Sequence, residues 1–182
     1  ELNATLYNGW RHLYFIYPSL IFISIRGLEY LSKTFFSKYL LIIIFLFLLN
    51  TTFWMVKNHP YQFVYFNKFA GKNVGNYFEL DYWGTSNISA LSFIAKRDKR
   101  NDIKIYVFSD SPYHFSLLLA DKEVRYRIKF VNNLNEADYL VTNHYYQKNN
   151  PIFLNNKLKK EYKLLKEFKV DKMIINSIYK IN

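Results

Sequence analysis

The chain has 182 residues, the length of one ordinary domain or of a small domain with a membrane anchor. It contains no cysteine, which excludes a disulfide framework, a thiolate zinc site, an iron–sulfur cluster and cysteine catalysis. Aromatic residues make up 20% of the chain, which excludes intrinsic disorder, and the 5 glycines form no phosphate-binding loop. The net charge of +11 indicates an anionic partner or a solvated lysine-rich surface.

The first apolar segment covers residues 13–31. Its uninterrupted part, residues 13–25, is short for a membrane span, but the full segment is long enough if Arg26 extends its guanidinium to the membrane surface. Pro18 predicts a kink, which membrane helices tolerate. No small-residue cleavage site follows, which disfavours a signal peptide. We therefore predict a transmembrane helix over residues 13–31, with residues 1–12 as an external loop.

The second apolar segment, residues 39–56, contains 18 residues and no charge. A helix rises 1.5 Å per residue, so this segment would cover about 27 Å, close to the thickness of a hydrocarbon core. The alternative is a buried helix of a water-soluble protein. Such a long helix usually has a polar face, and this segment has none. We therefore predict a second transmembrane helix over residues 39–56.

The flanks of the two segments predict their orientation. The connector, residues 32–38, is short and basic, and short basic loops remain in the cytoplasm. Residues 57–182 are then expected outside the cytoplasm. Aromatic residues flank the outer ends of both segments, as in the belts of membrane helices. These residues are Tyr7, Trp10, Tyr14, Trp54, Tyr61 and Tyr65.

The sequence pattern of residues 57–182 predicts a small α/β domain with a mixed sheet. Pro60 suits the first turn of a helix that ends at Gly71, and we expect this helix to lie along the membrane interface. A second helix is predicted over residues 87–96, with Thr85 or Ser86 as its N-cap.

The remaining elements are one short helix and five strands. The run Asp110-Ser111-Pro112 provides an N-cap and an N1 proline, which predict a short helix that ends at Ala120. Asp171 and Lys172 separate the last two strands, which we expect to form a hairpin. The strands are predicted to begin at Ile103, Tyr126, Asp138, Tyr162 and Met173.

The charge is concentrated in residues 57–182, which carry a net charge of +9. A basic domain tethered to a bilayer would be attracted by anionic lipid headgroups, at about 1 kcal/mol for each lysine or arginine near the surface. A solvated lysine-rich surface that keeps the domain soluble explains the same charge equally well. A nucleic-acid partner is not predicted, because DNA and RNA are not found on the outer side of the membrane.

Two residue types that often mark catalysis are weak signals here. The four histidines, His12, His59, His114 and His144, show no metal-binding spacing, so no metal site is predicted. Asp110, Ser111 and His114 could suggest a hydrolase triad. The strand–Asp–Ser–Pro–helix context explains the first two as helix caps, and the nucleophile-elbow motif is absent.

Two clusters are candidate binding sites. Arg11 and His12 precede the first apolar segment, and the Arg11 guanidinium could hold a phosphate by paired hydrogen bonds. The alternative is an arginine that anchors a helix end at the membrane surface. Glu79, Asp81 and Trp83, with Tyr82 between them, combine carboxylates with aromatic faces, as sugar-binding sites do. The alternative is a packed loop in which the carboxylates are themselves capped by hydrogen bonds.

The chain resembles the C-terminal part of bacterial multi-pass glycosyltransferases of the protein-mannosyltransferase-like group, family 39 and its relatives, within the GT-C superfamily. Several runs occur in the same order as in these enzymes. They are LYNGWRHLYFIYP at Leu6–Pro18, HPYQFVYFNKFAG at His59–Gly71, FELDYWGTS at Phe78–Ser86, ADYLVTN at Ala137–Asn143 and SIYKI at Ser177–Ile181.

This resemblance implies a hexosyltransferase of the bacterial inner (cell) membrane that moves a sugar from a polyprenyl-phosphate donor to an extracytoplasmic acceptor. The family's catalytic Asp lies in an early external loop and has no counterpart in this chain, so Asp81 is not assigned that role. Arg11 and His12 would lie near the donor phosphate. The expected partners are membrane lipid, the donor and the remaining transmembrane helices of the full-length protein. The resemblance leaves cofactor and metal requirements open.

The alternative is a non-catalytic membrane-anchored periplasmic domain that binds a glycan or a protein partner. Because the chain begins with Glu1 rather than Met, we expect a fragment or a processed product. The upstream sequence separates the two hypotheses. Further spans with an early external Asp support the enzyme, and an immediate start codon supports the binding domain.

Overall fold

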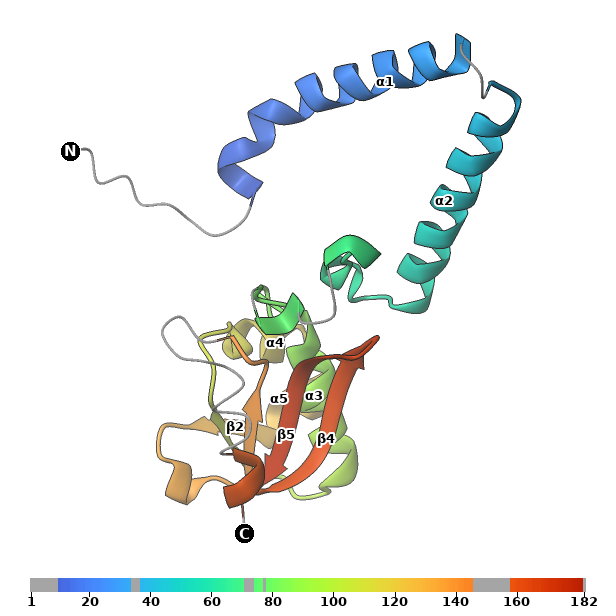
Figure 1. The fold of residues 1–182 in the computed structure, drawn as a ribbon. Coiled ribbons are helices and arrows are strands. Elements are labelled where there is room, and N and C mark those ends of the chain that lie inside the picture. The colour runs from blue at the N-terminus through green and yellow to red at the C-terminus, as the bar shows by residue number, and fades with distance from the viewer. Residues whose placement is uncertain (1–9, 34–36, 71–73, 77, 146–157, 182) are drawn as a thin grey trace, which may run out of the picture. The chain divides into compact units, whose positions relative to one another are not determined.

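The chain divides into two compact units, Glu1–Trp54 and Met55–Asn182, which are described separately (Figure 1). The computed structural model describes residues 10–33, 37–70, 74–76, 78–145 and 158–181.

The first unit is helical. The 3₁₀ helix η1, Trp10–Ile16, continues into α1, Tyr17–Lys33, and α2 covers Ser37–Lys57. Pro18 is the second residue of α1, where its missing N–H leaves no hydrogen bond unmade. Pro18 thus lies next to the junction between η1 and α1, and the kink at this residue stays a prediction. No residue of α1 is buried.

One helix in the described part of the chain is long and apolar enough to cross a membrane. It is the stretch Tyr39–Lys57 within α2, and none of it is buried inside the structure. The predicted first span does not meet the same criteria, because α1 has 17 residues and carries Arg26, Glu29 and Lys33. The two-helix membrane hairpin is therefore not confirmed by length and composition.

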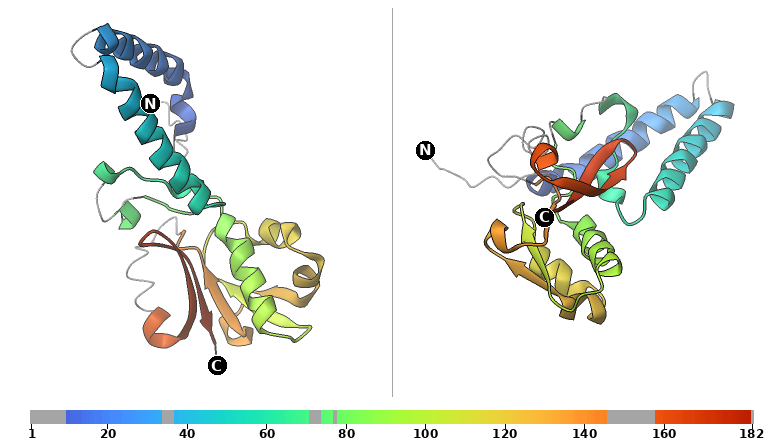
Figure 2. Two further views of the ribbon diagram at one scale, coloured as in Figure 1. Left: turned by 90° about the vertical axis from the view of Figure 1, so that its right-hand side faces the viewer. Right: turned by 90° about the horizontal axis from the view of Figure 1, so that it is seen from below.

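The second unit contains a five-stranded mixed sheet, as predicted, with the strand order β2-β1-β3-β5-β4. The C-terminal strands of this sheet are drawn in red in Figure 2. Strand β1 pairs in parallel with β2 and β3, and β5 pairs antiparallel with β3 and β4. The strands are β1, Ile103–Val107; β2, Ile128–Val131; β3, Tyr139–Thr142; β4, Lys163–Val170; and β5, Met173–Lys180.

Three helices, α3 (Thr85–Arg97), α4 (Tyr113–Leu119) and α5 (Lys122–Arg127), pack against one face of the sheet. Their apolar side chains form the main core with Ile103 and Ile105 of β1. The other face carries a smaller cluster. It contains Leu140, Leu158 and Tyr179, with Tyr106, Phe108, Leu134, Tyr162 and Ile181 packed against it. Alternate residues of the strands thus point to the two apolar layers, as the twofold repeat of a strand requires.

Strand prediction is largely confirmed. Strand β1 begins at Ile103, and β4 and β5 form the predicted hairpin across Asp171, which adopts a φ of 52°. The strand expected from Tyr126 begins only at Ile128, because α5 extends to Arg127.

The single helix predicted over residues 60–71 is wrong. The described part of this stretch contains two short 3₁₀ helices, η2 (Gln62–Val64) and η3 (Lys68–Ala70), with Tyr65 in an extended conformation after the first. Aromatic residues have modest helix propensity, and the Asn67 side chain accepts from the backbone N–H groups of Phe69 and Ala70. These local hydrogen bonds compete with a continuous helix.

Both predicted N-caps are also wrong. Thr85 and Ser86 lie inside α3, whose N-cap is Gly84. The N-cap of α4 is Pro112, and no side chain caps that helix. The helix itself is present, and it ends one residue earlier than predicted, at Leu119.

Candidate functional site

The turn from Phe78 to Gly84 connects to the N-terminus of α3. The Gly84 N–H donates to the Asp81 carbonyl at 3.0 Å, and Asn143, directly after β3, donates its side-chain N–H to the same carbonyl at 2.7 Å. The turn therefore lies at the carboxyl edge of the parallel strands, next to the point where β2 and β3 flank β1. In open α/β sheets this edge is the usual location of a ligand.

Asp81 is buried and caps α3. Its Oδ1 accepts from the Thr85 N–H at 2.9 Å, and its Oδ2 accepts from the Ser86 N–H at 3.1 Å and from the Ser86 hydroxyl. A negative charge is favourable at a helix N-terminus. Burial raises the pKa of Asp81 to about 6, against the lowering effect of the hydrogen bonds from Ser86 and Thr85. Both oxygens of the Asp81 carboxylate thus accept hydrogen bonds from the first residues of α3.

The glycine at position 84 is required by two features of this turn. Its φ is 67°, a left-handed conformation that residues with a side chain rarely adopt. A Cβ at this position would lie 2.3 Å from Nδ2 of Asn87. The turn therefore needs glycine at position 84 to place the Asp81 carboxylate at the N-terminus of α3.

A polar network continues from Ser86 into the core. The side-chain N–H₂ of Asn176, on β5, lies within hydrogen-bond distance of Ser86 Oγ at 2.9 Å, Tyr113 OH at 3.1 Å and Asn87 Oδ1 at 3.2 Å. Asn87 in turn donates to Ser111 Oγ at 3.1 Å. The network joins α3, α4, β5 and the loop after β1, so it fixes the carboxyl edge of the sheet. We call these residues, together with Asp81, the Asp81 network.

Trp83 points outward from the same turn and is 61% exposed. The Tyr82 ring lies edge-on to both Trp83 and Tyr145, with centroid distances of 5.0 and 5.1 Å. Glu79 is exposed. Of the three candidate sugar-binding residues in this turn, Asp81 therefore faces the helix, whereas Glu79 and Trp83 are on the surface. Only these two are accessible to a ligand from solution.

The other candidate cluster is described only in its backbone. Arg11 and His12 belong to η1, but their side chains lie outside the part of the chain that the structure describes. Their contact with a phosphate therefore stays a prediction. The Tyr7 of the predicted aromatic belt also lies outside the described residues.

The other histidines have different surroundings. The His114 ring packs edge-on to Phe130 at 4.8 Å, and Ser111 Oγ lies 2.9 Å from Ser109 Oγ, so these contacts do not resemble a triad. His144 follows β3 with a φ of 61°, and its Nε2 lies 2.8 Å from Ser177 Oγ. Burial lowers the pKa of His144 to about 4. His144 is therefore neutral at pH 7.

The sequence analysis did not assign Asn143, His144 or Asn176 to this site. Asn143 and His144 directly follow β3, and polar residues at strand ends are a usable signal of a site at a sheet edge, but the sequence placed Asn143 inside the predicted strand. Asn176 lies inside a strand, where the sequence pattern gives no such signal. Within the residues that the structure describes, no group of three His, Asp or Glu side chains could hold a metal ion.

At the opposite end of the domain, arginine side chains bind backbone carbonyl oxygens and carboxylates. Arg127 is buried and donates to the carbonyl oxygens of Ala95 at 3.0 Å, Arg100 at 2.9 Å and Asp98. Arg100 forms ion pairs with Asp98 at 2.7 Å and Asp138 at 2.9 Å. Hydrogen bonds from Arg100 hold the pKa of Asp98 well below its usual range. This charged end, where α3 terminates, contrasts with the aromatic turn where α3 begins.

Comparison of the chain with protein-family models, curated proteins and solved structures gives no match. Any functional conclusion therefore rests on the residues and their arrangement.

Proposed function

We propose that this chain is the C-terminal part of an integral-membrane glycosyltransferase that moves a sugar from a polyprenyl-phosphate donor to an acceptor outside the cytoplasm. The observation that carries the proposal is α2, an exposed apolar helix of spanning length that leads directly into a folded α/β domain. The choice of a glycosyltransferase among membrane proteins is supported by the ordered resemblance of the sequence runs. The catalytic Asp belongs to a part of the enzyme outside this chain.

In this proposal η1 and α1 form the first of two spans. They run without interruption from Trp10 to Lys33, which is long enough to cross a bilayer. Glu29 pairs with Arg26 and, at 2.8 Å, with Lys33, so a single negative charge balances one of the two positive charges near the end of α1. Long basic side chains near a helix end can also reach the membrane surface.

The proposed role of Arg11 and His12 is to bind the donor phosphate. Both precede the apolar part of the first span, so in this topology they lie at the outer membrane surface, where a polyprenyl-linked phosphate is located. An arginine binds phosphate through two parallel hydrogen bonds, and hydrogen bonds to charged groups contribute about 1.5 to 3 kcal/mol.

Kinetics of sugar transfer test this function. The Arg11→Ala variant of the protein that contains this chain is expected to lower kcat/KM for a polyprenyl-phosphate hexose by roughly tenfold to a hundredfold, which corresponds to the lost hydrogen bonds. The matched control is Arg26→Ala, which removes an arginine from the other end of the same span. It is expected to leave the donor kinetics unchanged.

The outcomes separate the hypotheses. Equal kinetics for the wild type and both variants would reject the phosphate role of Arg11. If the wild type transferred no sugar from any polyprenyl-phosphate hexose, the non-catalytic alternative, a membrane-anchored domain that binds a glycan or a protein, would replace the enzyme.

A further inference from the structure

We propose that residues 61–70, 74–76 and 78–83, which lie between α2 and α3, form a docking surface for the lipid headgroup region, so that the α/β domain rests on the bilayer through this aromatic segment. The inference rests on the membrane anchoring by α2 that is part of the proposed function. We call these described residues the aromatic segment.

Among the described residues of the second unit, exposed aromatic side chains are concentrated in this segment. Phe69 is 96% exposed and Trp83 is 61% exposed. Large apolar side chains gathered on a surface mark a protein or membrane contact, and aromatic residues are enriched at the membrane–water interface. The exposed aromatic residues of the segment are Phe63, Tyr65, Phe69, Phe78 and Trp83.

The segment is fixed to the domain, so this exposure does not come from a lack of packing. Val64 is completely buried and Val74 nearly so. The Tyr61 hydroxyl lies 2.7 Å from Ser89 Oγ on α3, and the Phe66 and Phe78 rings pack with a centroid distance of 5.4 Å. The segment therefore presents one set of side chains to the core and keeps another set outside.

The chain itself places the segment near the bilayer. Helix α2 ends at Lys57, and Tyr61, only four residues later, is already bound to Ser89 in the N-terminal half of α3. A step of four residues covers at most about 14 Å. The end of the domain where α3 begins must therefore lie close to the membrane surface if α2 spans the bilayer.

Helix α4 adds apolar surface at the same end. Its residues Phe115, Leu118 and Leu119 are exposed and have the spacing of one helix face. Asn87, in the first turn of α3, donates to Ser116 Oγ of α4 at 3.4 Å. This contact places α4 beside the start of α3.

The other end of α3 has the opposite character. Arg100, Asp98 and Asp138 form the ion pairs described above, and Lys129 pairs with Asp102 at 3.1 Å. The 13 residues of α3 separate the two ends by about 20 Å. The domain thus has an aromatic end and a charged end, as expected for a domain that contacts a bilayer on one side and water on the other.

Spin labels test the orientation in the full chain reconstituted in phosphatidylcholine–phosphatidylglycerol bilayers. Since the chain has no cysteine, each introduced cysteine is the only labelling site. Phe69→Cys and Trp83→Cys place labels in the aromatic segment. Tyr126→Cys is the matched control, because Tyr126 is 77% exposed and precedes Arg127 at the charged end. Leu46→Cys reports on the middle of α2.

We expect the ratio of collision rates with oxygen and with a water-soluble nickel complex to be several-fold higher at positions 69 and 83 than at position 126. If Leu46 gave a high ratio while positions 69, 83 and 126 all gave the same low ratio, the docking surface would be rejected and the membrane anchor retained. A low ratio at Leu46 as well would reject both. Phe78→Cys provides a second exposed position if either label in the segment disturbs the fold, which circular dichroism detects.

Discussion

Asp81 and His144 lie near the same edge of the sheet, and burial shifts their pKa values in opposite directions. The pKa of Asp81 is raised to about 6, and that of His144 is lowered to about 4. The ordinary values are 3.8 and 6.5. Both groups are therefore held closer to their neutral forms in the folded domain than in the unfolded chain.

These shifts have opposite effects on stability. The contribution of Asp81 is fully present below pH 3.8 and is lost as the pH rises through about 6. The contribution of His144 is present above pH 6.5 and is lost as the pH falls through about 4. Each corresponds to about 3 kcal/mol at full extent. In the wild-type protein the two contributions nearly cancel over this interval.

Variants that remove either Asp81 or His144 should reveal that their contributions to the free energy of unfolding cancel in the wild-type protein. We expect the free energy of unfolding of Asp81→Asn to decrease from about pH 7 to about pH 4.5, because only the His144 contribution remains. His144→Asn keeps a residue that tolerates a left-handed φ, and its free energy of unfolding should increase over the same interval. Denaturant titration of the micelle-solubilised protein, followed by near-ultraviolet circular dichroism, measures both. Parallel pH profiles for the two variants would contradict the assignment.

The sequence indicated the turn around Asp81 but not the direction of its carboxylate. Local rules select the nearest Ser or Thr as an N-cap, here Thr85 or Ser86. The structure uses a carboxylate further upstream, and this depends on the left-handed Gly84. The choice between a sugar site and a helix cap depends on burial by β5 and on Asn143, and both contacts come from distant parts of the chain.

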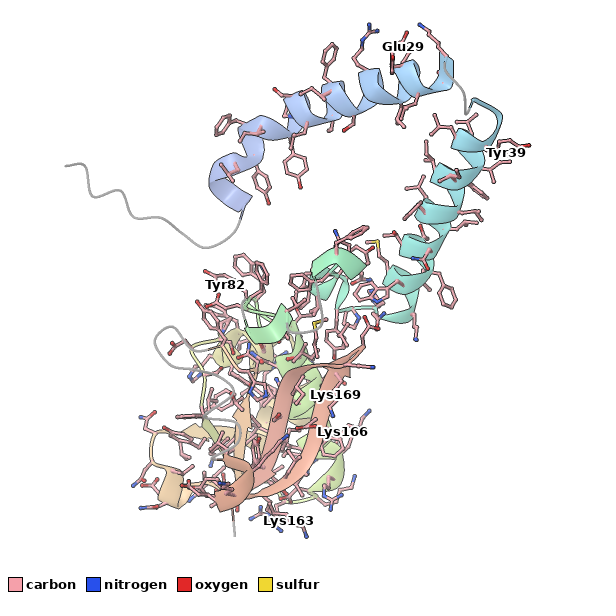
Figure 3. The ribbon with its side chains drawn as sticks, viewed as in Figure 1. Glu29, Tyr39, Tyr82, Lys163, Lys166 and Lys169 are labelled. Carbon is pink, nitrogen blue, oxygen red and sulfur yellow. The ribbon has the colours of Figure 1, made fainter. Side chains whose placement is uncertain are left out.

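At the scale of elements, β4 is an edge strand of the described sheet. It pairs with β5, and its residues Lys163, Lys166 and Lys169 are exposed along it (Figure 3). The pairing with β5 contains two register shifts, between Leu164 and Lys166 and between Phe168 and Lys169. Lysines and bulges on an edge strand prevent pairing with the edge of another molecule.

Loss of these lysines should therefore promote association. The double variant Lys163→Val and Lys166→Val is expected to form dimers and larger species, because it exposes an apolar edge with unpaired backbone groups. Sedimentation of the micelle-solubilised protein measures this. The control, Lys96→Val with Lys122→Val, removes the same charge from α3 and α5 and should stay monomeric. Equal association of both variants would indicate a charge effect rather than an edge effect.

The success of strand prediction and the failure over residues 60–71 have a common cause. The strands have alternating or continuous apolar residues with β-branched side chains, so local preference and burial agree. In residues 60–71 the apolar residues also fit a helix, but only part of them is buried. Tyr61 and Val64 contact the domain, whereas Phe69 is exposed, and this division depends on tertiary contacts.

At the scale of the whole molecule, the chain combines an apolar helix with a basic α/β domain. The mixed sheet was predictable because each strand has its own local pattern. The first span, predicted over residues 13–31, is not confirmed, because this segment combines apolar length with Arg26 and Glu29, and hydropathy alone does not decide such a segment. The sugar-transfer activity stays a proposal, because the proposed phosphate-binding side chains of Arg11 and His12 lie outside the described residues.

The proposed topology predicts which positions an impermeant reagent can reach. Lys172→Cys lies in the exposed β4–β5 turn, and Lys33→Cys lies in the last turn of α1. In intact cells whose outer membrane is permeabilised, a charged maleimide should label Lys172→Cys. It should label Lys33→Cys only after the inner membrane is opened as well. The reverse pattern would place the α/β domain in the cytoplasm and would exclude an extracytoplasmic acceptor.

The Asp81 network has a consequence for the order of its hydrogen atoms. The Asn176 amide has two hydrogens but three acceptors within reach, and the single Ser86 hydroxyl hydrogen has the Asp81 carboxylate and the Ile175 carbonyl within reach. The planar amide fixes the directions of its two hydrogens, so at most two of the three acceptors can receive a well-aligned hydrogen bond at one time. The Ser86 hydroxyl hydrogen is directed at the closer, negatively charged Asp81 carboxylate rather than at the Ile175 carbonyl, which is 3.3 Å away. Loss of the Asn176 amide would therefore remove a donor that α3 and α4 share.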